Sequence, residues 1–188
     1  MVDWRKIGSG PTFNALVSAI LLQNDRETYI FNRDGRDGAI DALSGDKKTV
    51  YQSKYHGTGT SAQAFSDANK ELKKIKKYQS TAHKWHAIWN DVGTWCLVTN
   101  VKFGPQDELR WDKEVRPKFG ALGITPTYQT SAHLDNELIK HRDIAAAFLV
   151  TALDYLSRSR STGNPFLAER SSSVLMTCPS RDATQSWP

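Results

Sequence analysis

The chain has 188 residues, of which 39% are hydrophobic and 24% charged, and its formal net charge is +5. This length and composition are typical of a globular domain with a core of its own. No apolar run approaches the roughly 20 residues that a membrane span requires, and the first ten residues lack the apolar segment of a secretory signal. The two cysteines, Cys96 and Cys178, are too few for a disulfide framework. We therefore expect a cytoplasmic protein with no membrane partner, and its positive charge is compatible with a polyanionic partner.

The first predicted element is a helix that begins near Pro11, because proline suits a first helical turn. One face of this helix carries apolar residues at helical spacing, namely Phe13, Leu16, Val17, Ile20 and Leu21. Strands are predicted over Thr28–Phe31, Ala39–Leu43 and Thr49–Tyr55. Residues 44–48 between the last two of these strands are predicted to form a hairpin loop.

The rest of the chain alternates between helical and extended patterns. Helices are predicted over Ser61–Tyr78, Pro105–Val115 and Asp143–Leu156, and strands over Trp95–Asn100 and Gly123–Gln129. Thr60 and Gln63 have the spacing of a capping box at the start of the first of these helices. Pro126 places the last strand at a sheet edge, because proline cannot donate a ladder hydrogen bond.

This order of elements predicts an α/β fold with a mixed central β-sheet flanked by α-helices. We expect one domain over residues 1–156. Residues 157–188 are rich in Ser and Arg and show no periodicity, which indicates an irregular tail or linker.

The predicted hairpin combines an acid, an amide and a lysine. Side chains two residues apart on a strand share a face, so Gln52 and Lys54 are expected to point the same way. A loop centred near residues 45–46 places Asp41 roughly opposite Tyr51 and Gln52. Since cross-strand neighbours lie about 5 Å apart, the three functional groups are expected to converge.

These groups predict a metal-dependent phosphodiesterase centre. Mg²⁺ prefers hard oxygen ligands, and we expect them from the Asp41 carboxylate, the Gln52 side chain and the backbone carbonyl of Ser53, with Mn²⁺ as a substitute metal. A bound metal lowers the pKa of its water and polarises a phosphate, while Lys54 can orient that water or stabilise the developing charge.

The alternative is a solvated hairpin with Gln52 and Lys54 facing water. It explains poorly why an acid interrupts the apolar segment AIDAL.

The segments GRDGAIDAL and TVYQSKYH resemble the core of the PD-(D/E)xK nuclease superfamily. The similarity is to the QxK variant of Mrr-type restriction endonucleases and of effector nuclease domains in anti-phage systems, and it covers about residues 13–128. It implies a restriction-endonuclease-like core in which Asp41 is the metal-binding aspartate and Gln52 and Lys54 form the Q-x-K motif. It also implies an endonuclease that hydrolyses DNA with Mg²⁺, in a restriction or antiviral defence system.

The motif departs from the family pattern, and the chain offers further candidate residues. Asn14 stands where many relatives carry a glutamate in the first helix, so the site has fewer charges. Asp37 also precedes the motif strand and is an alternative acid, but Asp41 is preferred because it lies within a predicted strand. His56 follows the motif lysine and is a further candidate for substrate contact.

A run of lysines on the predicted second helix suggests contact with DNA phosphates. The candidates are Lys70, Lys73, Lys74 and Lys77. Lysines that neutralise phosphates release counterions and make binding sensitive to salt. The alternative is a solvated helix face, which is the usual role of such a run.

Because cleavage of both strands of a duplex needs two active sites, we expect a homo-oligomer. The resemblance also implies that the chain works beside a sensor or ATPase module. Two other functions are compatible with the sequence. One is a catalytically inactive module of the same fold that binds DNA or supports assembly, which Asn14 favours. The other is a junction-resolving nuclease.

Overall fold

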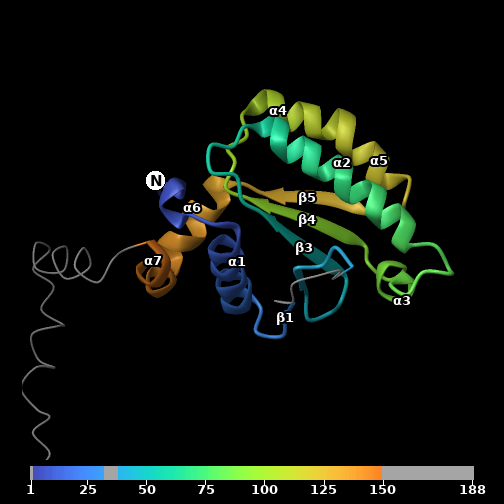
Figure 1. Cartoon of the computed structure of the whole chain (residues 1–188), viewed down its shortest axis with the longest axis horizontal. Helices are drawn as coiled ribbons and strands as arrows, with labels where there is room; N and C mark the ends of the chain where they lie inside the picture. The colour runs from blue at the N-terminus through green and yellow to red at the C-terminus, as the bar shows by residue number, and fades with distance from the viewer. Residues whose placement is uncertain (1, 32–37, 150–188) are drawn as a thin grey trace, which may run out of the picture. The chain divides into compact units, whose positions relative to one another are not determined.

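A computed structural model describes residues 2–31 and 38–149 (Figure 1). The strands are β1 (Tyr29–Ile30), β2 (Ala42–Leu43), β3 (Thr49–Lys54), β4 (Thr94–Thr99) and β5 (Thr125–Gln129). The helices are α1 (Gly10–Asn24), α2 (Ser61–Tyr78), α3 (His86–Trp89), α4 (Pro105–Arg110), α5 (Arg116–Gly120), α6 (Ser131–Lys140) and α7 (Arg142–Leu149). A 3₁₀ turn, η1 (Trp4–Ile7), precedes α1, and a π-helical turn, η2 (Trp111–Val115), joins α4 to α5.

The strands form one mixed sheet in the order β1-β2-β3-β4-β5. The pairs β1–β2 and β2–β3 are antiparallel, whereas β3–β4 and β4–β5 are parallel. Parallel neighbours require a crossover, which α2 and α3 supply between β3 and β4, and α4, η2 and α5 supply between β4 and β5. The predicted α/β class and mixed sheet are therefore confirmed.

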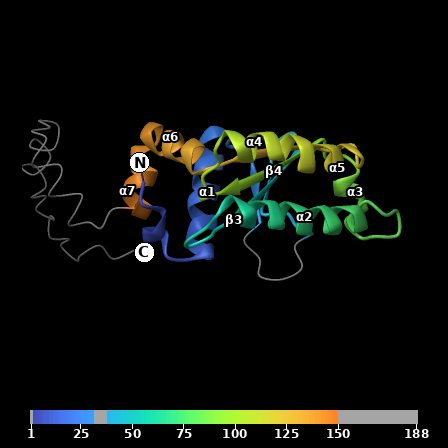
Figure 2. The same ribbon diagram turned by 90° about the horizontal axis from the view of Figure 1, so that it is seen from above.

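Each face of the sheet carries its own apolar core. The side chains of α2, α3, η2 and α5 pack on one face, and those of η1, α1, α6 and α7 pack on the other. Figure 1 shows the two helical layers on opposite sides of the strands, and Figure 2 shows α2 running beside α4 and α5. The central strand β4 is thus almost wholly buried, as expected where parallel strands are linked by helices, whereas the edge strand β5 is exposed at Thr125 and Thr127.

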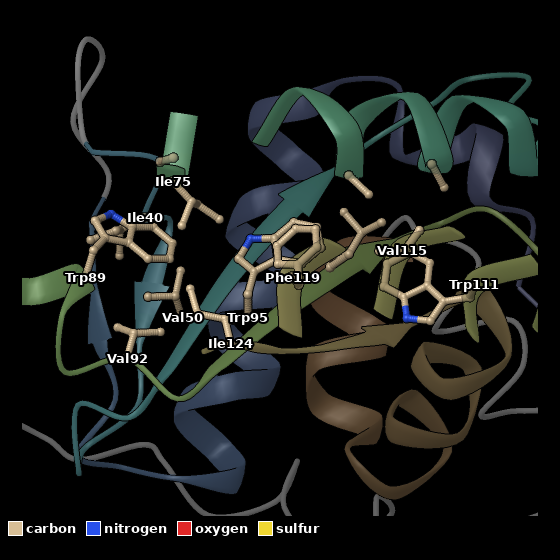
Figure 3. Packing of buried hydrophobic residues seen from close by; sticks show 14 of the residues in the cluster. Ile40, Val50, Ile75, Trp89, Val92, Trp95, Trp111, Val115, Phe119 and Ile124 are labelled. Atoms are coloured by element: carbon tan, nitrogen blue, oxygen red, sulfur yellow. The ribbon is translucent and has the colours of Figure 1, made fainter. Parts of the chain in front are cut away.

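Aromatic side chains fill the core beneath α2. Trp95, Trp111 and Phe119 are almost wholly buried, and the Trp95 and Phe119 rings stack with centroids 4.7 Å apart. Figure 3 shows this group beside Val50 and Ile124. Offset aromatic contacts of this kind stabilise a core beyond their area of burial.

The helix α1 forms as the periodicity predicts. The predicted face is buried, with Phe13 and Leu16 fully excluded from solvent. The Ser9 hydroxyl accepts the Thr12 backbone N–H at 3.2 Å, and Pro11 lies in the first turn. Capping and burial together therefore determine where this helix begins.

The predicted strand over Ala39–Leu43 is wrong in its first half. Ala39 has a φ of +61°, so the chain turns there, and β2 begins only at Ala42. Asp41 is a bend residue just before the strand. A positive φ is uncommon outside glycine and is incompatible with extended backbone.

The second half of the chain contains more helix than the sequence indicated. The predicted polar helix continues beyond Val115 through α5, and α6 was not predicted. Leu134 and Leu138 of α6 are buried, but the segment offers few other apolar residues to reveal the period. The last predicted helix begins at Arg142 and is described to Leu149, so the predicted boundary at residue 156 and the tail lie outside the described residues.

Within residues 2–31 and 38–149, no helix is both long and apolar enough to cross a membrane.

Candidate functional site

The register of the hairpin places Asp41 beside the motif strand. Ala42 pairs with Tyr51 and Leu43 pairs with Val50, so Asp41 lies across from Gln52. The Asp41 backbone N–H donates to the Tyr51 carbonyl at 3.2 Å. The predicted position of Asp41 opposite Tyr51 and Gln52 is confirmed, although Asp41 precedes the strand. The predicted convergence of the three functional groups is not shown, because the Asp41 carboxylate bonds to Ser53, whereas Gln52 bonds to Trp95 and Lys54 pairs with Glu71.

The Asp41 carboxylate meets Ser53 at the edge of β3. Asp41 Oδ2 accepts the Ser53 backbone N–H at 2.7 Å and lies 3.2 Å from the Ser53 hydroxyl. That hydroxyl also lies 2.8 Å from Asn14 Oδ1, and it can donate its single proton to only one of the two acceptors at a time. The structure therefore brings Asn14 of α1 to the acid of the motif.

The side chains of β3 alternate between the two faces of the sheet as predicted. Val50, Gln52 and Lys54 face the α2 layer, because Val50 belongs to that core and Lys54 reaches α2. Tyr51 packs on the α1 side, where the Ser53 hydroxyl meets Asn14. Burial raises the pKa of the Tyr51 hydroxyl above its ordinary value, so this group is neutral at physiological pH.

Gln52 is a buried residue. The residue is 3% exposed, and its Oε1 accepts the Trp95 indole N–H at 3.3 Å. The alternative of a hairpin whose Gln52 faces water is therefore wrong. Since an amide oxygen carries two lone pairs, this bond holds the group in place and leaves one lone pair for a metal.

The predicted metal ligands fit Mg²⁺ in chemical kind. The Tyr51 carbonyl points toward Asp41, and the Ser53 carbonyl, two residues along the strand, points to the same edge. Together with the Asp41 carboxylate and the Gln52 amide these are hard oxygen donors with one negative charge. Over the described part of the chain, no three His, Cys, Asp or Glu side chains are grouped as a metal site, and the predicted set is not of that type.

Lys54 pairs with an acid that sequence reasoning missed. Its Nζ lies 3.4 Å from Glu71 Oε1, and Lys74 Nζ lies 2.9 Å from the same oxygen. The Glu71 side chain is only 3% exposed and that of Lys54 is 27% exposed. The sequence does indicate that Glu71 is buried, because it lies three residues after Ala68 and four before Ile75, on the apolar face of α2.

His56 is held against α2 in a similar way. Its Nε2 lies 2.8 Å from Asp67 Oδ2, and its backbone N–H and carbonyl bond to the Asn100 side chain at 2.8 and 2.6 Å. A Cβ at Gly59 would lie 2.4 Å from His56 Cβ, so the loop that follows requires glycine there. His56 is thus bonded to Asp67 and Asn100, two residues that were not predicted, and its contact with substrate stays a prediction.

The four candidate DNA-binding lysines are all exposed on α2. Lys70 lies 3.5 Å from Asp67 Oδ1, and Lys74 pairs with Glu71, so acids of the same helix offset part of their charge. Lys73 and Lys77 lie one turn apart on this surface. Their contact with DNA stays a prediction.

The alternative acid Asp37 lies outside the described residues, so its position is not compared with that of Asp41.

Comparison with known proteins adds no relative: no protein-family model and no curated protein sequence matches this chain.

Proposed function

We propose that this protein is a Mg²⁺-dependent DNA endonuclease with a restriction-endonuclease-like core, of the QxK type within the PD-(D/E)xK superfamily. The observation that carries the proposal is the hairpin register. It sets Asp41 across from Gln52, with Lys54 next along the same face of β3. A role as the nuclease of a restriction or antiviral defence system follows from the sequence resemblance.

The arrangement of the sheet supports this proposal. An antiparallel hairpin carries the motif, parallel strands follow it, and helices cover both faces. The candidate residues lie where β2 begins and β3 ends, and there the Asp41 carboxylate accepts the Ser53 N–H in place of a strand partner. The carboxyl end of a strand is a common position for a site on an α/β sheet.

The residues have distinct roles in the proposed reaction. Asp41, Gln52 and the Ser53 carbonyl would hold Mg²⁺, or Mn²⁺ in its place. When bound, the metal activates water and polarises the scissile phosphate. The Ser53 N–H orients the Asp41 carboxylate, and the Trp95 indole orients the Gln52 amide. The Lys54 ammonium donates to the attacking water or to the phosphate oxygen on which charge develops.

A second candidate function is a non-catalytic DNA-binding or assembly module. Two contacts and one substitution favour it. The Asp41 carboxylate already accepts the Ser53 N–H and the Gln52 oxygen already accepts the Trp95 N–H, while Asn14 contributes no charge. In this interpretation the polar groups of the hairpin stabilise the end of β3.

Plasmid cleavage separates the two functions. We expect the full chain to nick or linearise supercoiled plasmid with Mg²⁺ or Mn²⁺ and not with EDTA. Lys54→Met is expected to lower the rate at least about 100-fold, because it removes a donor aimed at developing charge. Lys48→Met is the matched control, since Lys48 is an exposed lysine in the loop of the same hairpin.

Metal titration by calorimetry completes the test. Mn²⁺ should bind the wild-type chain and bind Asp41→Asn more weakly. Binding of plasmid without cleavage, and without any metal binding, would support the non-catalytic module. Cleavage by Lys54→Met at the wild-type rate would contradict the assigned site.

A further inference from the structure

Two acids of α2 face two basic residues at the end of β3. Lys54 and His56 are two residues apart, about 6.6 Å along an extended chain. Asp67 and Glu71 are four residues apart, about 6.0 Å along a helix. The spacing of the two basic residues therefore matches the spacing of the two acids, and the structure pairs His56 with Asp67 and Lys54 with Glu71.

Each acid also contacts a lysine one turn further along α2. Asp67 reaches Lys70 and Glu71 reaches Lys74. The result is two parallel rows that run from β3 through a buried acid to the exposed surface of the helix. The row through Glu71 links the motif lysine, Lys54, to one of the candidate DNA-binding lysines.

Glu71 is the more deeply buried of the two acids. The residue is 2% exposed, and both ammonium groups approach its Oε1, while its Oε2 is buried and has no hydrogen-bond partner among the described residues. A buried carboxylate without compensation is costly, so the adjacent ammonium groups are what make this position tolerable for a charged residue. Such burial also prevents Glu71 from touching DNA itself.

We propose that Glu71 is a positioning residue of the candidate site, which fixes the ammonium group of Lys54 and couples it to Lys74. The catalytic consequence rests on the proposed function: Lys54 acts from a fixed place as a cation, and the buried carboxylate limits its freedom to move away. The pairing of Lys54 with Glu71 does not depend on nuclease activity and is tested separately.

A double-mutant cycle measures the pairing. The full chain is unfolded in urea as wild type, Lys54→Met, Glu71→Gln and the double variant. We expect the effects on the unfolding equilibrium constant to be non-additive by about threefold or more, as for contacting charged residues. The matched control is Glu137→Gln with Lys54→Met, because Glu137 also pairs with a lysine three residues on but lies on α6. This second cycle should be additive.

Glu71→Met provides a second cycle if Glu71→Gln does not fold, because an apolar side chain of similar volume avoids an uncompensated buried polar group. An additive Lys54 and Glu71 cycle would overturn the proposal.

Kinetics on a duplex substrate test the catalytic consequence. Glu71→Gln is expected to lower kcat about tenfold with little change in KM, since it disturbs a group used in the transition state. Lys74→Met should mainly raise KM. A Glu71→Gln enzyme with unchanged kcat would contradict the positioning role. A coupled pair in a chain that does not cut DNA would instead contradict the proposed function, so the two failures are distinguishable.

Discussion

Ser53 contacts two residues of the candidate site, Asp41 and Asn14, through one backbone N–H and one hydroxyl. The N–H holds the Asp41 carboxylate, and the hydroxyl lies between Asp41 and Asn14. The sequence motif leaves the residue at this position unspecified, and only its backbone carbonyl is expected to take part, as a metal ligand. Its backbone and side chain nevertheless set where the acid lies, because β2 has ended and no strand partner remains there for the N–H.

A prediction at this scale concerns Cys96, which is 4% exposed in β4. Burial raises the pKa of its thiol to about 11, an effect partly offset by a hydrogen bond with Thr127. Since the thiolate is the reactive form, we expect Cys96 to react with maleimide at pH 8 about 100-fold more slowly in the folded chain than in urea. Mass spectrometry of the peptide that contains Cys96 measures this rate. Fast labelling in native buffer would contradict the buried position.

At the scale of the element, α2 combines a core-facing side, two acids and an exposed lysine surface. Phe65, Ala68 and Ile75 are buried, as the amphipathic pattern predicted. The predicted capping pair is confirmed, since Gln63 Oε1 accepts the Thr60 N–H at 2.9 Å. The helix thereby determines where the candidate DNA-binding lysines and Glu71 lie relative to β3.

The exposed lysines of α2 carry a prediction for DNA binding. Lys73→Ala with Lys77→Ala should weaken binding to a short duplex and reduce the slope of log K against log salt by about 2, because each phosphate that a lysine neutralises accounts for roughly 0.9 of that slope. Fluorescence anisotropy between 50 and 200 mM KCl, roughly the range in which this effect is large, measures the slope. The control is Lys48→Ala with Lys113→Ala, two exposed lysines elsewhere. An unchanged slope would mean that α2 is a solvated face.

For the whole molecule, a helical layer packs on each face of the sheet, and along β3 the α2 layer buries Val50 and Gln52 while Tyr51 and Ser53 on the other face stay half-buried. Gln52 therefore lies inside the α2 layer and not on the surface. On the other face, α6 is tied to α1, because Glu137 Oε2 accepts the Asn24 amide at 2.9 Å and His141 Nε2 lies 3.2 Å from Asn24 Oδ1. These contacts join segments more than a hundred residues apart in the sequence.

The link between α6 and α1 predicts a pH dependence of stability. Hydrogen bonds from Lys140 and then Asn24 lower the pKa of Glu137 below its ordinary value. A carboxyl whose pKa is lower in the folded state stabilises the fold above its unfolded pKa of about 4.3, and this contribution is lost as the pH falls through the folded pKa. Glu137→Gln should therefore be less stable than wild type at pH 7.

The difference in urea midpoint between wild type and Glu137→Gln is expected to shrink below about pH 4. Glu114→Gln, which removes an exposed pair with Arg110, is the control. A difference that stays constant from pH 7 to pH 3 would contradict a lowered pKa of Glu137.

The sequence by itself determined the elements whose patterns are local. These elements are the helices α1 and α2, with their apolar periods, and the strands β3 and β4, with an alternating pattern and an apolar run. Each pattern reflects which residues of one segment share a buried face, so it can be recognised in the sequence without knowledge of the fold. The same alternation placed Gln52 and Lys54 on one face, and the hairpin loop placed Asp41 across from Gln52.

Only the tertiary structure decided what these residues contact. The positive φ of Ala39 interrupts the extended backbone, so that β2 begins only after Asp41. Leu134 and Leu138 stabilise α6 as a helix because they are buried in the same core as residues of α1. The pairing of Lys54 with Glu71 joins residues of two elements whose relative placement no local pattern specifies. Packing sets that placement, because a buried charge is tolerated only where the fold brings its partner to it.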